Sequence, residues 1–214
     1  MNESRKREAM NLPNQLSILR ILLTPIFVSL LFVEHLPFKI AAFVVFIVAT
    51  LTDYYDGYAA RKYNIITVTG QFLDPLADKI LVSSSLISFN VLGYVPTWMV
   101  LVIVIRDFVI TGFRSYAILK GKPIVTHRLA KAKTYLQMVV LYGVFLYHLA
   151  AWPEPAVRFE SFLIRIQEWN VLYNLLLGVT ALTVVTGGLY LVENRSHIKS
   201  IARNIIRIFL PSDG

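Results

Sequence analysis

Long apolar segments constrain this chain more than any other feature, because six stretches are each long enough to cross a lipid bilayer as a helix. A membrane-spanning helix needs about 20 mostly apolar residues. Of the 214 residues, 56% are hydrophobic and only 16% are charged. The sequence therefore predicts an all-α integral membrane protein with six transmembrane helices and a short N-terminal interfacial helix. The predicted spans cover residues 16–33, 38–59, 72–91, 96–118, 129–151 and 169–192.

The connections between these spans are short, so the whole chain is predicted to form one membrane domain. Residues 1–15 are expected to form an N-terminal surface segment, residues 16–192 the six spans, and residues 193–214 a basic cytoplasmic tail. The first 15 residues are polar and basic over too long a run for a signal peptide. The sequence contains no cysteine, which excludes disulfides, thiolate metal ligands and cysteine nucleophiles.

Lysine and arginine are concentrated at one set of span ends, in residues 5–7, 61–62, 114–133 and 195–207. The opposite ends carry only Lys39, Arg158 and Arg165. Positively charged connections mark the cytoplasmic side of a membrane protein, so both termini are predicted to be cytoplasmic. The net charge of +8 would attract anionic headgroups. A membrane surface, and not a nucleic acid, is therefore the expected partner.

Four aspartates lie in the segment DYYDGYAARKYNIITVTGQFLDPLAD, at the predicted cytoplasmic ends of the second and third spans. Residues three or four positions apart share one face of a helix, which pairs Asp53 with Asp56 and Asp74 with Asp78. Pro75 is expected in the first turn of its helix, where a missing N–H costs nothing. Two antiparallel helices with a short loop can bring all four carboxylates together. Because ionised carboxylates repel one another and are costly to desolvate near a bilayer, they require a cation.

The ligand type and the intervening residues indicate a metal-bridged diphosphate substrate. Oxygen ligands without Cys or His suit Mg²⁺, Mn²⁺ or Ca²⁺. Gly57 and Ala60 share the face of Asp53 and leave room for a bulky group, and Arg61 could bind a phosphate at headgroup level. One alternative is a set of separate helix-terminal aspartates. Another is a divalent-cation transporter, which would place its ligands near the bilayer midplane and not at one end of the spans.

The aspartate segment resembles, at every fixed position, the signature of the CDP-alcohol phosphatidyltransferases, a family of six-helix membrane enzymes. The matching residues read Asp53-x2-Asp56-Gly57-x2-Ala60-Arg61-x8-Gly70-x3-Asp74-x3-Asp78. The resemblance implies two divalent ions, usually Mg²⁺ with Mn²⁺ as a substitute, held by Asp53, Asp56, Asp74 and Asp78. It implies a CDP-binding side lined by Gly57, Ala60, Arg61 and Gly70, with Asn14 and Arg20 as supporting candidates. It also implies that Asp78 is the catalytic base and that the enzyme is a homodimer.

Three further stretches resemble the branch of the family that makes phosphatidylglycerophosphate in bacteria: NLPNQLSILRILLTP at 11–25, RDFVITGFR at 106–114 and AKAKTYLQ at 130–137. This branch implies CDP-diacylglycerol as donor, sn-glycerol 3-phosphate as acceptor and the bacterial inner membrane as location. Other acceptors in the family remain open, namely phosphatidylglycerol, inositol phosphate and serine. The last 70 or so residues match only in hydropathy and length.

A phosphorylated acceptor needs cationic side chains beside the metals. The candidates on or near cytoplasmic span ends are Arg106, Arg114, Arg128, Lys131 and Lys133. Arg106 lies within an apolar run, where an arginine indicates a functional site or a buried ion pair. Asp107, its neighbour, projects about 100° away on a helix and is an uncertain partner. The alternative for Lys131 and Lys133 is that they extend to the membrane interface only.

Overall fold

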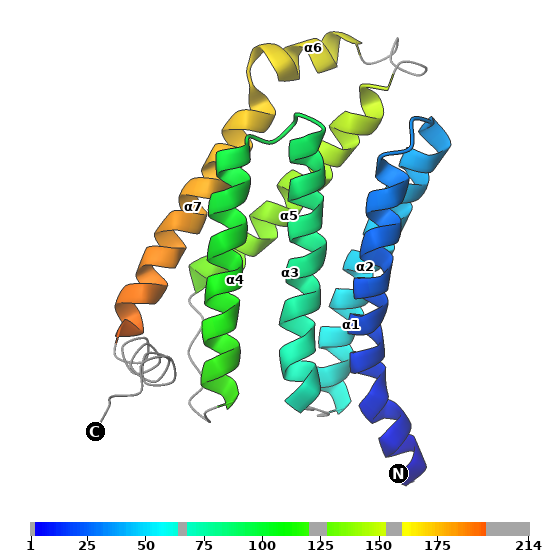
Figure 1. The fold of residues 1–214 in the computed structure, drawn as a ribbon, viewed down its shortest axis with the longest axis vertical. Helices are drawn as coiled ribbons and strands as arrows, with labels where there is room; N and C mark the ends of the chain where they lie inside the picture. The colour runs from blue at the N-terminus through cyan, green and yellow to red at the C-terminus, as the bar shows by residue number, and fades with distance from the viewer. Residues whose placement is uncertain (1–2, 64–67, 120–127, 153–159, 196–214) are drawn as a thin grey trace, which may run out of the picture.

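The computed structural model describes the backbone of residues 3–63, 68–119, 128–152 and 160–195, and the side chains of residues 15–52, 74–118, 129–152 and 161–195. All regular secondary structure in this part of the chain is α-helical. The helices are α1 (Glu3–Leu31), α2 (Leu36–Tyr63), α3 (Val68–Val91), α4 (Thr97–Leu119), α5 (Arg128–Ala150), α6 (Glu160–Glu168) and α7 (Val171–Glu193). Six long helices run along the molecule, and the short α6 lies across one end of it (Figure 1).

The all-helical prediction is confirmed, and each predicted span coincides with a long helix. Two details differ. The predicted N-terminal interfacial helix is not separate, because α1 runs without a break from Glu3 to Leu31. Residues before the last span form α6, an amphipathic helix that the hydropathy pattern did not indicate. The chain then turns into α7 at Asn170, whose φ of 47° is in the left-handed region.

Fewer of the described helices pass a combined test of length and hydropathy for crossing a membrane than the six apolar stretches predict. Among the described residues, α7 is the one helix that is both long and apolar enough to cross a membrane by composition. Gln15–Leu31 and Leu36–Thr52 are apolar but shorter. In α4, the charged residues Arg106, Asp107 and Arg114 interrupt the apolar run. Six crossings therefore remain a prediction.

Four buried phenylalanines hold α1, α2, α3 and α5 together. Phe145 of α5 lies 5.9 Å from Phe27, 5.8 Å from Phe46 and 5.4 Å from Phe89, measured between ring centroids. All four side chains are fully buried. Aromatic rings of this size contribute more apolar contact than any other side chains. This cluster therefore fixes how α3 and α5 lie relative to the first two helices.

The interior of the remaining half contains small polar residues. In α7, the buried Thr180, Thr183 and Thr186 each donate a hydrogen bond to the carbonyl four residues earlier. Such bonds satisfy a hydroxyl within its own helix. Small residues of this kind let neighbouring helices approach closely where both are apolar. α7 packs against α4 and α5, and α4 packs against α3. These four helices surround the cavity described below.

Candidate active site

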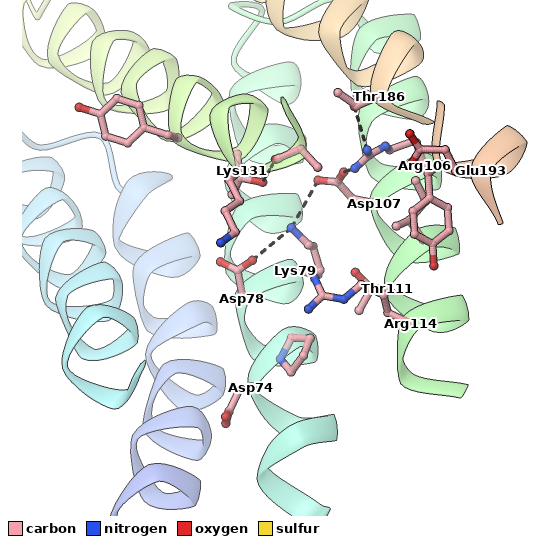
Figure 2. Close-up of a pocket in the computed structure, with 16 residues that line it drawn as sticks. Asp74, Asp78, Lys79, Arg106, Asp107, Thr111, Arg114, Lys131, Thr186 and Glu193 are labelled. Atoms are coloured by element: carbon pink, nitrogen blue, oxygen red, sulfur yellow. Dashed lines mark hydrogen bonds and ion pairs between the residues drawn. The ribbon is translucent and has the colours of Figure 1, made fainter. Parts of the chain in front are cut away.

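A cavity of about 540 Å³ lies between α3, α4, α5 and α7. It is near the end of the molecule where α7 finishes at Glu193 (Figures 1 and 2). Charged side chains line much of it: Asp74, Asp78, Lys79, Arg106, Asp107, Arg114, Lys131 and Glu193. Eight charged groups around one cavity in so apolar a chain are expensive unless they are paired or bind a ligand. The pairing of each one therefore indicates what the cavity can bind.

Asp74 and Asp78 lie one turn apart on α3, both are partly buried, and both line the cavity. The hydroxyl of Ser17, a fully buried residue of α1, donates to Oδ1 of Asp74. Lys79 Nζ lies 3.1 Å from Oδ2 of Asp78. Among the described residues, each aspartate therefore keeps a second carboxylate oxygen with no hydrogen-bond or ion-pair partner. That oxygen can accept a further hydrogen bond or contact a cation.

Pro75, between the two aspartates, does not lie in a first helical turn as predicted. α3 begins at Val68, so Pro75 is in the helix interior. A proline there removes the hydrogen bond to the carbonyl four residues earlier, which belongs to Gln71. The prediction failed because the helix extends further towards its N-terminus than the apolar run does.

Asp107 of α4 joins three cationic side chains. Its Oδ1 lies 2.6 Å from Lys133 Nζ of α5 and 3.1 Å from Arg106 Nη1, and its Oδ2 lies 3.6 Å from Lys79 Nζ of α3. Asp107 and Lys133 are both almost fully buried. Figure 2 shows Lys79 between Asp78 and Asp107, with Arg106 on the far side of Asp107. Through Lys79, the network connects Asp78 of α3 to Arg106 of α4 and Lys133 of α5.

Arg106 and Asp107, which sequence spacing left as uncertain partners, are therefore paired in the structure. The arginine side chain bends so that Nη1 reaches its neighbour, while Nη2 donates to Thr186 Oγ1 of α7 at 2.8 Å. Gly187 makes room for this side chain, because a Cβ at that position would lie 3.2 Å from Arg106 Cγ. α7 thus holds Arg106 against the cavity.

The predicted phosphate-binding cations fall into three groups. Arg106, Arg114 and Lys131 line the cavity together with Asp74 and Asp78. Lys133 does not line it, since the amino group is buried against Asp107. Arg128 is the first residue of α5, and its side chain lies outside the described residues. Three of the five predicted cations therefore line the cavity, and their contact with an acceptor stays a prediction.

Several donor-side predictions lie outside the described side chains: Asn14, Asp53, Asp56, Gly57, Ala60, Arg61 and Gly70. Arg20 is described; it is fully buried in α1, and its Nε donates to the Ala49 carbonyl of α2 at 3.3 Å. In the part of the chain whose side chains are described, no group of three or more His, Cys, Asp or Glu is close enough to hold a metal. Asp53 and Asp56 are not in that part.

Sequence reasoning missed several residues of the site. Ser17, Thr111 and Thr134 lie inside the three stretches quoted above, so the resemblance itself carried a signal for them. Thr186, Tyr190 and Glu193 of α7 had no such signal, because that part of the chain was recognised only by its hydropathy. In the structure all three line the cavity, and Thr186 also accepts a hydrogen bond from Arg106.

Comparison with known proteins identifies relatives of this chain by sequence. The family model for CDP-alcohol phosphatidyltransferase matches residues 10–180. A CDP-diacylglycerol–glycerol-3-phosphate 3-phosphatidyltransferase of Bacillus subtilis is 39% identical over 151 residues, covering 65% of this chain and 78% of that protein. The enzyme of that name from Mycoplasma pneumoniae is 31% identical over 198 residues, covering 84% of this chain and 85% of its own. A probable phosphatidylglycerophosphate synthase of Mycobacterium tuberculosis is 36% identical over 143 residues, covering 65% and 68%. The chain belongs to the CDP-alcohol phosphatidyltransferase family.

Proposed function

We propose that this protein transfers the phosphatidyl group of CDP-diacylglycerol to sn-glycerol 3-phosphate, giving phosphatidylglycerophosphate and CMP. The observation that carries the proposal is the cavity that Asp74 and Asp78 line together with Arg106, Arg114 and Lys131. Carboxylates suit a metal-bound diphosphate, whereas arginine and lysine suit a phosphate on the acceptor. The names of the relatives support the same pair of substrates.

We propose that Asp53, Asp56, Asp74 and Asp78 hold two divalent ions, Mg²⁺ or Mn²⁺. The two aspartates whose side chains are described, Asp74 and Asp78, suit this role. They are one turn apart, and each has a carboxylate oxygen without a described partner. Such ions, when bound, neutralise the diphosphate and stabilise charge on the departing CMP. Ser17 contributes by holding the orientation of the Asp74 carboxylate from a second helix.

In the proposed reaction a hydroxyl oxygen of glycerol 3-phosphate forms a bond to the lipid-linked phosphorus. The bond from that phosphorus to the bridging oxygen breaks, and CMP leaves with the electron pair. Asp78 accepts the hydroxyl proton. Aspartate carboxylates in general are weak bases. Positioning of the acceptor and electrostatic stabilisation therefore supply the larger share of catalysis.

Arg114 and Lys131 are the cations proposed to bind the acceptor phosphate first. Both are exposed and line the cavity, and neither makes an ion pair with a described carboxylate. Arg106 and Lys79, by contrast, are already engaged by Asp107. A phosphate entering the cavity gains two charge-assisted contacts without having to break an existing pair.

We propose six membrane crossings with both termini and the cavity on the cytoplasmic side of a bacterial inner membrane. The six long helices each contain 23 or more residues. At about 1.5 Å per residue that is about 34 Å, against a hydrocarbon thickness of about 30 Å. Large apolar side chains face outwards on them, such as Leu22, Val44, Leu101 and Val184. We propose that these apolar surfaces contact lipid, and that one of them contacts the second copy of the chain in a homodimer.

The test is CMP release by the purified full-length protein in detergent. CDP-diacylglycerol and Mg²⁺ are supplied, and glycerol 3-phosphate, inositol phosphate, serine and phosphatidylglycerol are offered separately. Release with glycerol 3-phosphate alone is expected, and its loss on chelation and return with Mg²⁺ would support the metal site. Release with a different acceptor would overturn the acceptor, and activity that survives chelation would overturn the metal dependence.

A further inference from the structure

One face of α7 forms a wall of the cavity beyond the region that the family model matches. Thr186, Tyr190 and Glu193 line it, at positions i, i+4 and i+7 of one helical face. The family match ends at residue 180. The three side chains therefore lie outside the part of the chain that matches the whole family, and a role in handling the shared CDP donor does not account for them.

Tyr190 is the unusual member of this wall. It is 8% exposed, and its hydroxyl makes no hydrogen bond with any residue that the structure describes. A buried tyrosine hydroxyl normally finds a partner, and leaving a buried donor unsatisfied costs about 1–3 kcal/mol. Thr186, on the same wall, donates to a carbonyl of its own helix and accepts from Arg106. Tyr190 therefore lacks a partner at a place where its neighbour is fully satisfied.

Arg106 and Arg114 line the same cavity as Tyr190. Glu193, one turn further along the same face of α7, lines it too, but its carboxylate accepts no hydrogen bond from the Tyr190 hydroxyl. Guanidinium groups are donors only, so neither arginine can accept the hydroxyl proton. What the hydroxyl needs is an acceptor oxygen that an arginine would also attract. A phosphate has three such oxygens and binds arginine through charge-assisted bonds. A phosphate would therefore satisfy the Tyr190 hydroxyl, and it is also the group that Arg114 and Lys131 are proposed to bind.

We infer that α7 supplies the acceptor-binding wall of the site, with the Tyr190 hydroxyl donating a hydrogen bond to the phosphate of the acceptor. The inference rests on the proposed function. The hydroxyl is shielded from solvent in the structure, so contact requires a small displacement of side chains that border the cavity, such as the exposed Arg114. Tyr190 is then a binding residue specific to a phosphorylated acceptor, and Thr186 is a positioning residue that acts through Arg106.

The test compares Tyr190→Phe with Tyr173→Phe in the full-length protein. Both variants lose only a hydroxyl on α7, but Tyr173 is near the start of the helix and lines a separate cleft at the other end of the molecule. Hydrogen bonds to charged groups contribute about 1.5–3 kcal/mol. Tyr190→Phe should therefore raise the KM for glycerol 3-phosphate about tenfold or more and leave the KM for CDP-diacylglycerol unchanged. Tyr173→Phe should change neither.

Thermal unfolding without substrates separates binding from a structural role. Removing an unpartnered hydroxyl should leave the Tm of Tyr190→Phe unchanged or raise it. A KM for glycerol 3-phosphate within twofold of the wild-type value would overturn the inference while leaving the proposed function intact. So would a lower Tm with both KM values raised. If the wild-type protein releases CMP only with an acceptor that has no phosphate, the proposed function fails and this inference fails with it.

Discussion

Asp78 combines two proposed roles in this site, as a metal ligand and as the catalytic base. It lines the cavity, it is one of the proposed metal ligands, and Lys79 lies 3.1 Å from its Oδ2. Asp78→Asn keeps the size of the side chain but removes the charge and the base. General-base catalysis contributes about 10²–10⁴-fold in rate, so kcat should fall by at least a hundredfold. CDP-diacylglycerol binding, measured by equilibrium titration, should remain detectable. Turnover near the wild-type rate would contradict the assignment of Asp78 as base.

Lys131 and Lys133 are two residues apart in sequence, but the structure gives them different environments. Lys133 is fully buried against Asp107, whereas Lys131 is exposed at the cavity. Removing one partner of a buried pair costs about 3–5 kcal/mol. Lys133→Met should therefore lower the Tm by several degrees. Lys131→Met should keep the Tm and raise the KM for glycerol 3-phosphate. Thermal unfolding and initial rates measure the two effects, and equal loss of stability in both variants would contradict the different placements.

At the scale of the element, the Arg106 side chain packs closely against α7 at Gly187. A Cβ on Gly187 would lie 3.2 Å from Arg106 Cγ, whereas a Cβ on Gly188 meets nothing within 4 Å. Gly187→Val should displace Arg106 from Thr186 and reduce kcat/KM for glycerol 3-phosphate by about tenfold, roughly the contribution of one hydrogen bond to a charged group. Gly188→Val is the matched control and should behave as wild type. Steady-state kinetics of both variants test this, and equal effects would point to a general intolerance of bulk in α7.

α3 and α4 show that the elements are coupled through charge as well as through apolar packing. Asp107 is the common partner of Lys79, Arg106 and Lys133, which come from α3, α4 and α5. The three ion pairs hold the buried Asp107 carboxylate in place, because moving any one of these helices would leave a buried charge unpaired. The network thus fixes the relative placement of the helices that carry Asp78 and the cations proposed to bind phosphate.

For the whole molecule, the absence of natural cysteines allows a direct test of orientation. Gln167 lies on α6 at one end of the molecule, and Arg195 follows α7 at the end near the cavity; both are exposed. In intact cells a membrane-impermeant maleimide should label Gln167→Cys. It should label Arg195→Cys only after permeabilisation. The opposite pattern would invert the proposed orientation. Labelling of both positions from outside would contradict the crossing of α7.

Much of the architecture could be predicted from sequence, because hydropathy and local spacing are properties of single helices. The six long helices follow the six apolar runs, and Asp74 and Asp78 share the face that a four-residue separation requires. The start of α3, the continuity of α1 and the presence of α6 were not predicted, because polar segments can also be helical where hydropathy gives no signal. Helix ends are therefore where the prediction from sequence was weakest.

The sequence by itself determined the helical class, the family signature and the set of residues available to hold a donor and a phosphate. Only the tertiary structure decided which of those residues meet. It turned Lys133 into the structural partner of Asp107, left Lys131 in the cavity, and brought Thr186 and Tyr190 from the last helix to the site. The physical reason is that helical periodicity relates residues within one helix. Contacts between helices far apart in sequence depend instead on how each helix is rotated and packed, and the pattern along the chain does not encode that.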